Sequence, residues 1–265
     1  ERRWRVGGAQ FATTFNDLLV NPESNKTAAD FVHRKIKEIV DDAQTAELLC
    51  PRGYPFAAKR LCVGTDYYET YNRPNIKLID INKNPIRELT SNGVLAGSEE
   101  HAFDAIVFAT GFDAVTGALL AIDIKGVNGM SLKEKWKDGP QTYLGVSVCG
   151  FPNMFIITGP GSPSVLSNVV MSIEQHVEWI SDCISYMHKH GLACIAARAE
   201  SERKWGEQVR NAVKGTLHEQ ANSWYLGANI PGKPRVFLVY IGGVWKYRQI
   251  MNDVANKNYT GYSLA

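Results

Sequence analysis

Two apolar runs, each followed directly by a glycine, restrict the folds open to this chain. Residues 103–110 (FDAIVFAT) precede Gly111, and residues 151–158 (FPNMFIIT) precede Gly159. A short run that is apolar on both faces is typical of a strand covered on both sides, as in the centre of an α/β sheet. The sequence therefore predicts an α/β fold, in which ligands bind outside the carboxyl ends of the strands.

Three further stretches have the pattern of strands, at residues 75–81, 86–97 and 235–243. The second of them contains Asn92-Gly93, a dipeptide that favours a two-residue hairpin turn. We therefore expect a hairpin there, and single strands at the other two positions.

Apolar residues at helical spacing predict amphipathic helices between these strands. Residues 27–40 form one, with Thr27 and Asp30 as a capping box, and a short helix over 43–49 follows Asp42 as its N-cap.

The longest predicted helix begins near Ser167 or Asn168 and ends near Gly191. Apolar residues recur there every three or four positions, which predicts an inward face of Val169, Ile173, Val177, Ile180, Ile184 and Met187. Two later helices are expected around residues 247–255 and over 199–217, the latter with Trp205, Val209 and Val213 inward.

The composition excludes several classes of partner. A net charge of +2 over 265 residues is too small to indicate nucleic acid or a membrane surface, and no apolar run is long enough for a membrane helix. Five cysteines without C-x-x-C spacing indicate neither disulfides nor a zinc site, so no metal is assigned and a cytoplasmic location is expected. Because the chain opens at Glu1 without a methionine, we expect a fragment.

Lys59 and Arg60 are adjacent cations where a core strand would carry valine or isoleucine. A guanidinium can hold an oxyanion at fixed geometry, and a lysine suits a phosphate. A solvated surface pair is the commoner explanation for such neighbours. Trp224, in the rigid loop predicted at 223–236, could lie over a ligand or pack beneath the loop.

Five segments taken in order resemble one family of flavoenzymes. They are KRLCVGTDYYETYNRPN, IVFATGFDAVTGALL, TYLGVSVCGFPNMFIITGPGSPSVLSN, SIEQHVEWI and SWYLGANIPGKPRVF. This ordered set resembles the C-terminal half of a Baeyer–Villiger monooxygenase of the phenylacetone, steroid and cyclohexanone monooxygenase type. The resemblance implies FAD and NADPH as cofactors, with O₂ and a ketone as substrates and an ester or lactone as product. The cofactors carry the difficult chemistry in such enzymes.

The resemblance also implies roles for individual residues. Arg60 matches the active-site arginine, which stabilises the anionic flavin peroxide and the ketone adduct. Lys59 matches a lysine that reads the 2′-phosphate of NADPH, and Trp224 matches a tryptophan that contacts NADP. Thr110 and Gly111 match backbone near FAD. The family's bulge beside the flavin and the ketone matches Ser164, Val165, Leu166, Ser167, Asn168 and Val169. In this match, Leu166 and Val169 would touch the substrate. Asn168 and Val169 would touch the cofactor.

Both glycine fingerprints of the family are absent, and by the resemblance they lie in a missing N-terminal half. The implied organisation is the end of a helical insertion at 1–55, part of the NADPH domain at 56–105 and part of the FAD domain at 106–265. The expected fold is thus a partial flavoprotein with remnants of two Rossmann-like domains. Such a fragment is expected to be inactive alone and to self-associate through uncovered apolar surface.

Two alternatives stay open at this point. The first is a flavin monooxygenase that oxygenates nitrogen or sulfur, against which Lys59-Arg60 before DYYETYN argues. The second is a non-catalytic binding or assembly half of a split flavoprotein.

Overall fold

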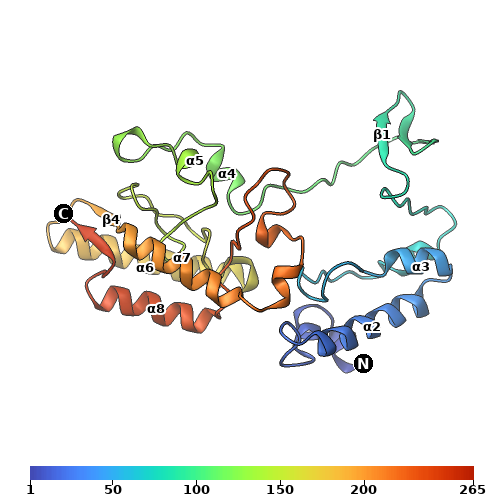
Figure 1. Cartoon of the computed structure of the whole chain (residues 1–265), viewed down its shortest axis with the longest axis horizontal. Coiled ribbons are helices and arrows are strands. Elements are labelled where there is room, and N and C mark those ends of the chain that lie inside the picture. The colour runs from blue at the N-terminus through green and yellow to red at the C-terminus, as the bar shows by residue number, and fades with distance from the viewer. The chain divides into compact units, whose positions relative to one another are not determined.

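The computed structural model describes residues 1–265, with the exception of the side chain of Ala9. The chain forms two compact units, Glu1–Gly111 and Phe112–Ala265 (Figure 1). In the part of the chain that is described, no helix has the length and apolar content needed to cross a bilayer.

The first unit begins with helices packed around a small apolar core. The elements are α1 (Arg2–Val6), the 3₁₀ turn η1 (Gly8–Thr13), α2 (Pro22–Ile39) and α3 (Ala43–Leu49). Apolar side chains spaced along α2 meet aromatic side chains from both flanks, and the buried set includes Phe11, Leu18, Val32, Ile36, Val40 and Phe56. The predicted helices of this region are therefore present, held by burial of one face of α2.

Two helix starts in this region test the sequence predictions. Asp42 caps α3 as predicted, because its carboxylate accepts a hydrogen bond from the backbone N–H of Thr45 at 2.7 Å. The capping box at Thr27 is wrong. The cap of α2 is Asn21, and Pro22 fits the first helical position because its φ suits a helix and no N–H is needed there.

A three-stranded antiparallel sheet follows the 3₁₀ turn η2 (Glu69–Asn72). It consists of β1 (Ile86–Leu89), β2 (Gly93–Ala96) and β3 (Glu99–Ala102). The hairpin predicted at Asn92-Gly93 is confirmed, since β1 and β2 pair across it. Gly93 is required there because a Cβ would lie 1.9 Å from the carbonyl oxygen of His101 on β3.

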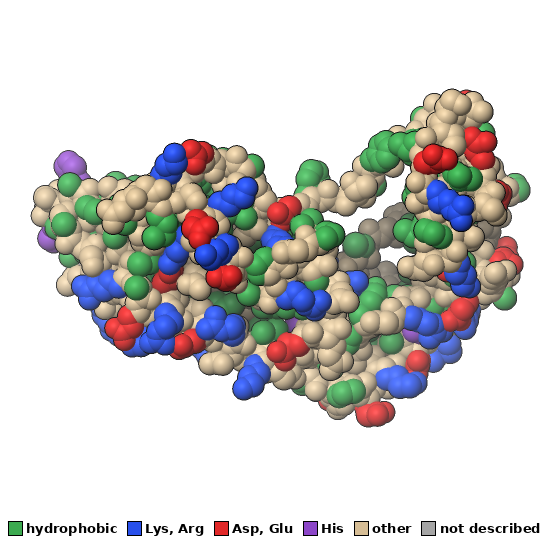
Figure 2. Space-filling view, turned by 45° about the horizontal axis from the view of Figure 1, so that its top comes forward, with side chains coloured by type: hydrophobic (Ala, Val, Ile, Leu, Met, Phe, Trp, Pro, Cys, Tyr) green, Lys and Arg blue, Asp and Glu red, His purple; other side chains and the backbone are tan. Residues whose placement is uncertain are grey.

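Four predicted strands are not strands in this structure: 75–81, 103–110, 151–158 and 235–243. A strand needs a neighbour to pair its backbone, and the described residues offer these runs no ladder. Val107 and Phe108 are 87% and 66% exposed, and Figure 2 shows hydrophobic side chains along the extended segment that follows β3. The covered parallel sheet expected for an α/β fold is therefore not formed within the described residues.

The second unit is built on three helices, α6 (Val169–Lys189), α7 (Ala199–Val213) and α8 (Val244–Asn256). Figure 1 shows α6 beside α8. The remaining elements are α4 (Gly117–Leu120), η3 (Val127–Gly129), α5 (Leu132–Lys135), η4 (Ser164–Leu166), β4 (Ile195–Ala197), η5 (Leu217–Gln220), η6 (Trp224–Leu226) and β5 (Tyr262–Leu264). Strands β4 and β5 pair antiparallel and were not predicted.

Helix α7 buries Trp205, Val209 and Val213, as the sequence predicts. It ends at Val213, four residues before the predicted end. The last helix is also confirmed, with Tyr247, Met251 and Val254 buried.

Helix α6 has the predicted start and end, but it buries a different face. Its buried residues are Ser172, Gln175, His176, Trp179, Ile180, Cys183 and Met187. Ile173, Val177 and Ile184 are 37%, 48% and 54% exposed, although the sequence places them inward. The side chains of Trp179 and His176 meet α8, where the indole Nε1 donates to the carbonyl of Met251 at 2.9 Å. Only Ile180 and Met187 of the predicted inward set are buried.

The exposed apolar stripe of α6 should make the chain self-associate. Association would remove this stripe from water, and each Å² of buried apolar surface lowers the free energy by about 25 cal/mol. We expect the double variant Ile173→Glu, Val177→Lys to be more monomeric than the unchanged chain in analytical ultracentrifugation. Glu178→Lys, at an exposed polar position of the same helix, is the control and should leave the association unchanged. A monomeric unchanged chain at high concentration would contradict this expectation.

Candidate functional site

The second unit contains an apolar cavity of about 500 Å³. Its wall combines the segment after Phe112, the loop before α6 and the loop that begins at η6. The lining residues are Ala114, Val115, Leu119, Phe155, Ile156, Ile157, Thr158, Gly159, Ser164, Val165, Val169 and Trp224. None of these side chains is charged, so the cavity suits an uncharged, largely apolar group of the size that ligand pockets accept.

The loop before α6 approaches its neighbours closely at Gly159. A Cβ there would lie 2.6 Å from the carbonyl oxygen of Gly145, so only glycine allows the two backbones to pack. The loop is also bonded to the segment after η6, because the N–H of Gly161 donates to Leu238 at 2.8 Å and Tyr240 donates to Ser162 at 2.9 Å. This wall of the cavity is thus held on two sides.

Thr158, next to Gly159, has a left-handed backbone with φ 51°. A β-branched residue is strained there and stays only when its surroundings hold it. Its N–H donates to Nδ1 of His176 on α6 at 2.9 Å. His176 is fully buried, and the pKa of its imidazole is lowered to about 4 by burial.

The residues expected to line a pocket between 164 and 169 divide into two groups. Ser164, Val165 and Val169 line the cavity. Leu166 is 40% exposed and does not line it, and the hydroxyl of Ser167 bonds the carbonyl of Ser164 at 2.8 Å instead. Asn168 caps α6 by accepting from the N–H of Val170 at 3.1 Å, which is the ordinary structural role.

Trp224 faces the same cavity from the opposite loop. The segment predicted as a loop begins with the short 3₁₀ helix η6 and continues without a longer helix or a strand, and Gly227 ends η6 with a left-handed backbone. Lys233 fastens the loop by an ion pair with Asp113, and Asn229 adds a hydrogen bond to the carbonyl of Phe112 at 3.4 Å. This ion pair was not predicted from the sequence, although Asp113 lies in the segment IVFATGFDAVTGALL and Lys233 in SWYLGANIPGKPRVF.

Lys59 and Arg60 belong to the first unit. They line a small hollow there together with Ala29, Pro51, Tyr54, Phe56, Ala57 and Leu61. The ammonium of Lys59 lies 4.3 Å from the centre of the Tyr54 ring, a cation–π contact, and Arg60 is exposed. Thr110 and Gly111 are also exposed, at the end of the same unit, and Gly111 has φ 83°.

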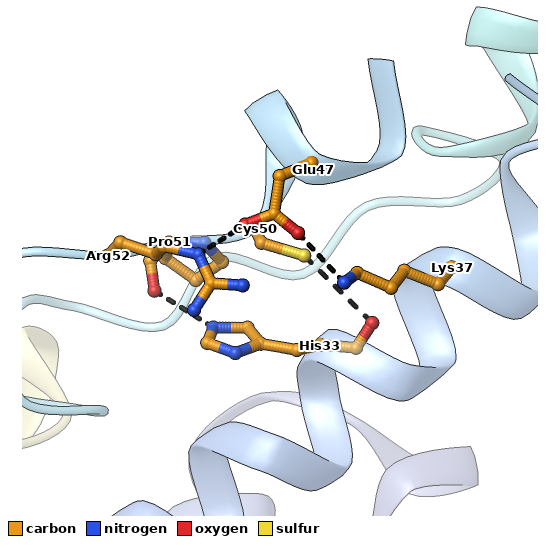
Figure 3. Close-up of polar contacts among 6 residues, drawn as sticks. All are labelled: His33, Lys37, Glu47, Cys50, Pro51 and Arg52. Carbon is orange, nitrogen blue, oxygen red and sulfur yellow. Dashed lines mark hydrogen bonds and ion pairs between the residues drawn. The ribbon is translucent and has the colours of Figure 1, made fainter. Parts of the chain in front are cut away.

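A polar cluster ties the chain that leads to Lys59 onto α2. Figure 3 shows Arg52 and Lys37 contacting the carboxylate of Glu47, at 2.5 and 2.7 Å, and the imidazole of His33 donating to the carbonyl of Pro51 at 2.9 Å. The hydrogen bond from Arg52, and to a lesser extent that from Lys37, lowers the pKa of Glu47 to about 2. The carboxylate is therefore ionised at neutral pH. Among the described residues, no three His, Cys, Asp or Glu side chains gather in a way that could hold a metal ion.

The ion pair between Asp113 and Lys233 should control the Trp224 loop. In Asp113→Asn we expect trypsin to cut after Arg235 about fivefold faster, because the lost pair is worth about 1 kcal/mol in a half-buried setting. Asp123→Asn removes a carboxylate that pairs with Lys125 on the surface and should leave the rate unchanged. Equal rates in the two variants would show that Lys233 does not hold the loop.

Known proteins match this chain over nearly its whole length, although no family model matches it. It is 42% identical to a phenazine N-monooxygenase of Lysobacter antibioticus, over all of this chain and 49% of that protein. It is 41% identical to a cyclohexanone 1,2-monooxygenase of Acinetobacter, over 100% of this chain and 48% of that one. A Baeyer–Villiger monooxygenase of Pseudooceanicola batsensis is 41% identical, over 98% and 48%.

Solved structures give the same result. An oxidised steroid monooxygenase bound to NADP superimposes with a TM-score of 0.92 at 44% identity, over 99% of this chain and 50% of that chain. A crystal structure of OTEMO in complex with FAD and NADP gives a TM-score of 0.90 at 42% identity, over 95% and 46%. The chain thus has part of the fold of flavin monooxygenases that bind two dinucleotides. It spans about half the length of these proteins and is a relative of the Baeyer–Villiger monooxygenases throughout its own length.

Proposed function

We propose that this chain forms about half of an FAD- and NADPH-dependent Baeyer–Villiger monooxygenase and supplies one wall of its ketone pocket. The observation that carries the proposal is the cavity of the second unit. It gathers Ser164, Val165 and Val169, which were singled out by resemblance, and Trp224 from a loop far away in the sequence, which the sequence pattern also offered as a ligand contact. The identity of about 40% to ketone monooxygenases supports the same reaction.

The cavity fits the ring parts of the implied molecules better than their phosphates. Its lining is apolar and uncharged, and Trp224 offers an aromatic face, which suits a nicotinamide ring, an isoalloxazine edge or a cyclic ketone. Phosphate groups need cations or helix N-termini. Lys59, in the first unit, is such a cation, and we assign it to the 2′-phosphate of NADPH.

Different residues of this chain have different roles in the proposed reaction. When bound, FAD and NADPH supply hydride transfer and the activation of O₂. Val165 and Val169 exclude water from the cavity, which strengthens electrostatic interactions there. Trp224 orients a ring by its flat face. Arg60, an exposed residue of the first unit, is assigned to the negative charge that develops during oxygenation, because a guanidinium stays charged and stabilises an anion wherever water is excluded.

The arginine role is tested in a fusion protein in which this chain replaces the matching half of the Acinetobacter cyclohexanone monooxygenase. We expect Arg60→Ala to lower ester formation by about a hundredfold or more, the typical loss for one electrostatic stabiliser. Reduction of FAD by NADPH, followed by absorbance, should survive.

Arg87→Ala is the matched control, because it removes the same charge from an exposed position of β1. It should convert ketone at the unchanged rate. Ester formation by Arg60→Ala at nearly the rate of the unchanged fusion would reject the role of Arg60.

N-oxygenation is a second candidate because a phenazine N-monooxygenase is as similar to this chain as the ketone enzymes are. Both reactions need an apolar pocket beside the flavin, so the uncharged cavity does not separate them. The pocket wall contributed by this chain is then the part that chooses between a cyclic ketone and a flat aromatic nitrogen heterocycle.

The same fusion protein decides between these substrates. We expect a higher kcat/KM for cyclohexanone than for phenazine, measured as product by chromatography with NADPH in excess. The unfused Acinetobacter enzyme is the control for any preference due to the other half. Oxygenation of phenazine with no ester from ketones would replace the proposal by N-oxygenation, and loss of both activities with FAD bound would support a binding or assembly role.

A further inference from the structure

We propose that His176 is a positioning residue of the cavity, whose neutral imidazole holds the backbone of Thr158 in the shape that lets the cavity accept a ligand. The proposal deepens the proposed function, on which only its kinetic test rests. Its structural test stands apart from any activity.

The hydrogen bonds define which nitrogen of His176 carries the proton. The N–H of Thr158 donates to Nδ1 at 2.9 Å, so Nδ1 bears the lone pair. The proton is therefore on Nε2, which donates to the hydroxyl oxygen of Tyr247 at 2.7 Å. That hydroxyl in turn donates to the carbonyl oxygen of Leu144 at 2.6 Å.

These hydrogen bonds form a relay from Thr158 through His176 and Tyr247 to Leu144, and the relay joins two strained bends. Thr158 has φ 51° and Leu144 has φ 59°, and neither is glycine. The two bends also touch, since a Cβ on Gly159 would strike the carbonyl of Gly145. His176 and Tyr247 are 0% and 1% exposed, so the bonds from His176 to Tyr247 and from Tyr247 to Leu144 are shielded from water, and the acceptor of the Thr158 bond is itself fully buried. The bond from Thr158 to His176 therefore supports a backbone geometry that threonine would not adopt by itself, and Tyr247 adds to the stability of the fold behind it.

The position of Thr158 gives the relay a role in binding. Thr158 and Gly159 line the cavity, whereas His176 lies behind them on α6. The rest of the loop reaches Ser164 and Val165, two residues of the same wall. If Thr158 relaxes to a right-handed backbone, the direction of the chain changes and the wall moves into or away from the cavity.

A pair of variants separates positioning from simple core packing. In His176→Asn the amide oxygen stands where Nδ1 stood and can still accept from Thr158, while the contact to Tyr247 is lost. In His176→Gln the longer side chain reaches toward Tyr247, and the acceptor for Thr158 is lost. Tyr247→Phe is the control, because it breaks the relay beyond His176 and leaves the bond to Thr158.

The first measurement uses the full chain labelled with ¹⁵N in threonine and histidine. In the unchanged chain we expect a deprotonated Nδ1, a protonated Nε2 and a strongly shifted Thr158 amide. The shifted amide should persist in His176→Asn and Tyr247→Phe and disappear in His176→Gln. A protonated Nδ1, or a Thr158 amide that is the same in all four proteins, would overturn the proposal.

The second measurement uses the fusion protein with cyclohexanone. We expect His176→Gln to raise KM about tenfold with a smaller change in kcat, and His176→Asn to restore KM to within about threefold. Tyr247→Phe should lower the melting temperature without raising KM. KM values that follow the melting temperature across the three variants would make His176 a packing residue only. If the unchanged fusion has no activity on ketones, the proposed function fails, while the amide measurement still decides the role of His176.

Discussion

The cavity of the second unit depends on one partly buried hydrogen bond, from the N–H of Thr158 to the buried imidazole of His176. Because the acceptor is on a fully buried side chain of α6, this bond governs the backbone next to it. Through Tyr247 the same imidazole also fixes the bend at Leu144. The opposite wall, formed by the Trp224 loop, is held by the ion pair between Asp113 and Lys233. Both walls are set by side chains that do not line the cavity.

The positions that line the cavity and those that support it follow different physical rules. Val165, Val169 and Trp224 offer apolar surface to a ligand, so their size and shape decide what is accepted. His176 and Lys233 act through bonds whose geometry allows little variation. We therefore expect substrate choice to change by substitution in the first group, and affinity for every ligand of the cavity to fall by those substitutions in the second group that break the bond.

Local signals in the sequence predict the helices and the hairpin but not the sheet. Asp42 and Asn168 cap helices because a side chain and a nearby N–H suffice, and Asn92-Gly93 turns the chain for equally local reasons. Strands 103–110 and 235–243 were predicted from apolar pattern, which reports burial but cannot supply a pairing partner. The face of α6 was wrong because the helix carries two overlapping apolar stripes, and packing of Trp179 and His176 against α8 selects one of them. Of the candidate site, the cavity contains Ser164, Val165, Val169 and Trp224, whereas the partners that hold its walls required three-dimensional contacts.

The central claim is that the cavity between the Thr158 and Trp224 loops takes the ketone. A crystal structure of the fusion protein with cyclohexanone or its lactone product tests this most directly. The account predicts density for the ring within the cavity, in contact with Val165, Val169 and Trp224. A ring bound elsewhere in the protein, with this cavity closed or filled by side chains, would contradict it.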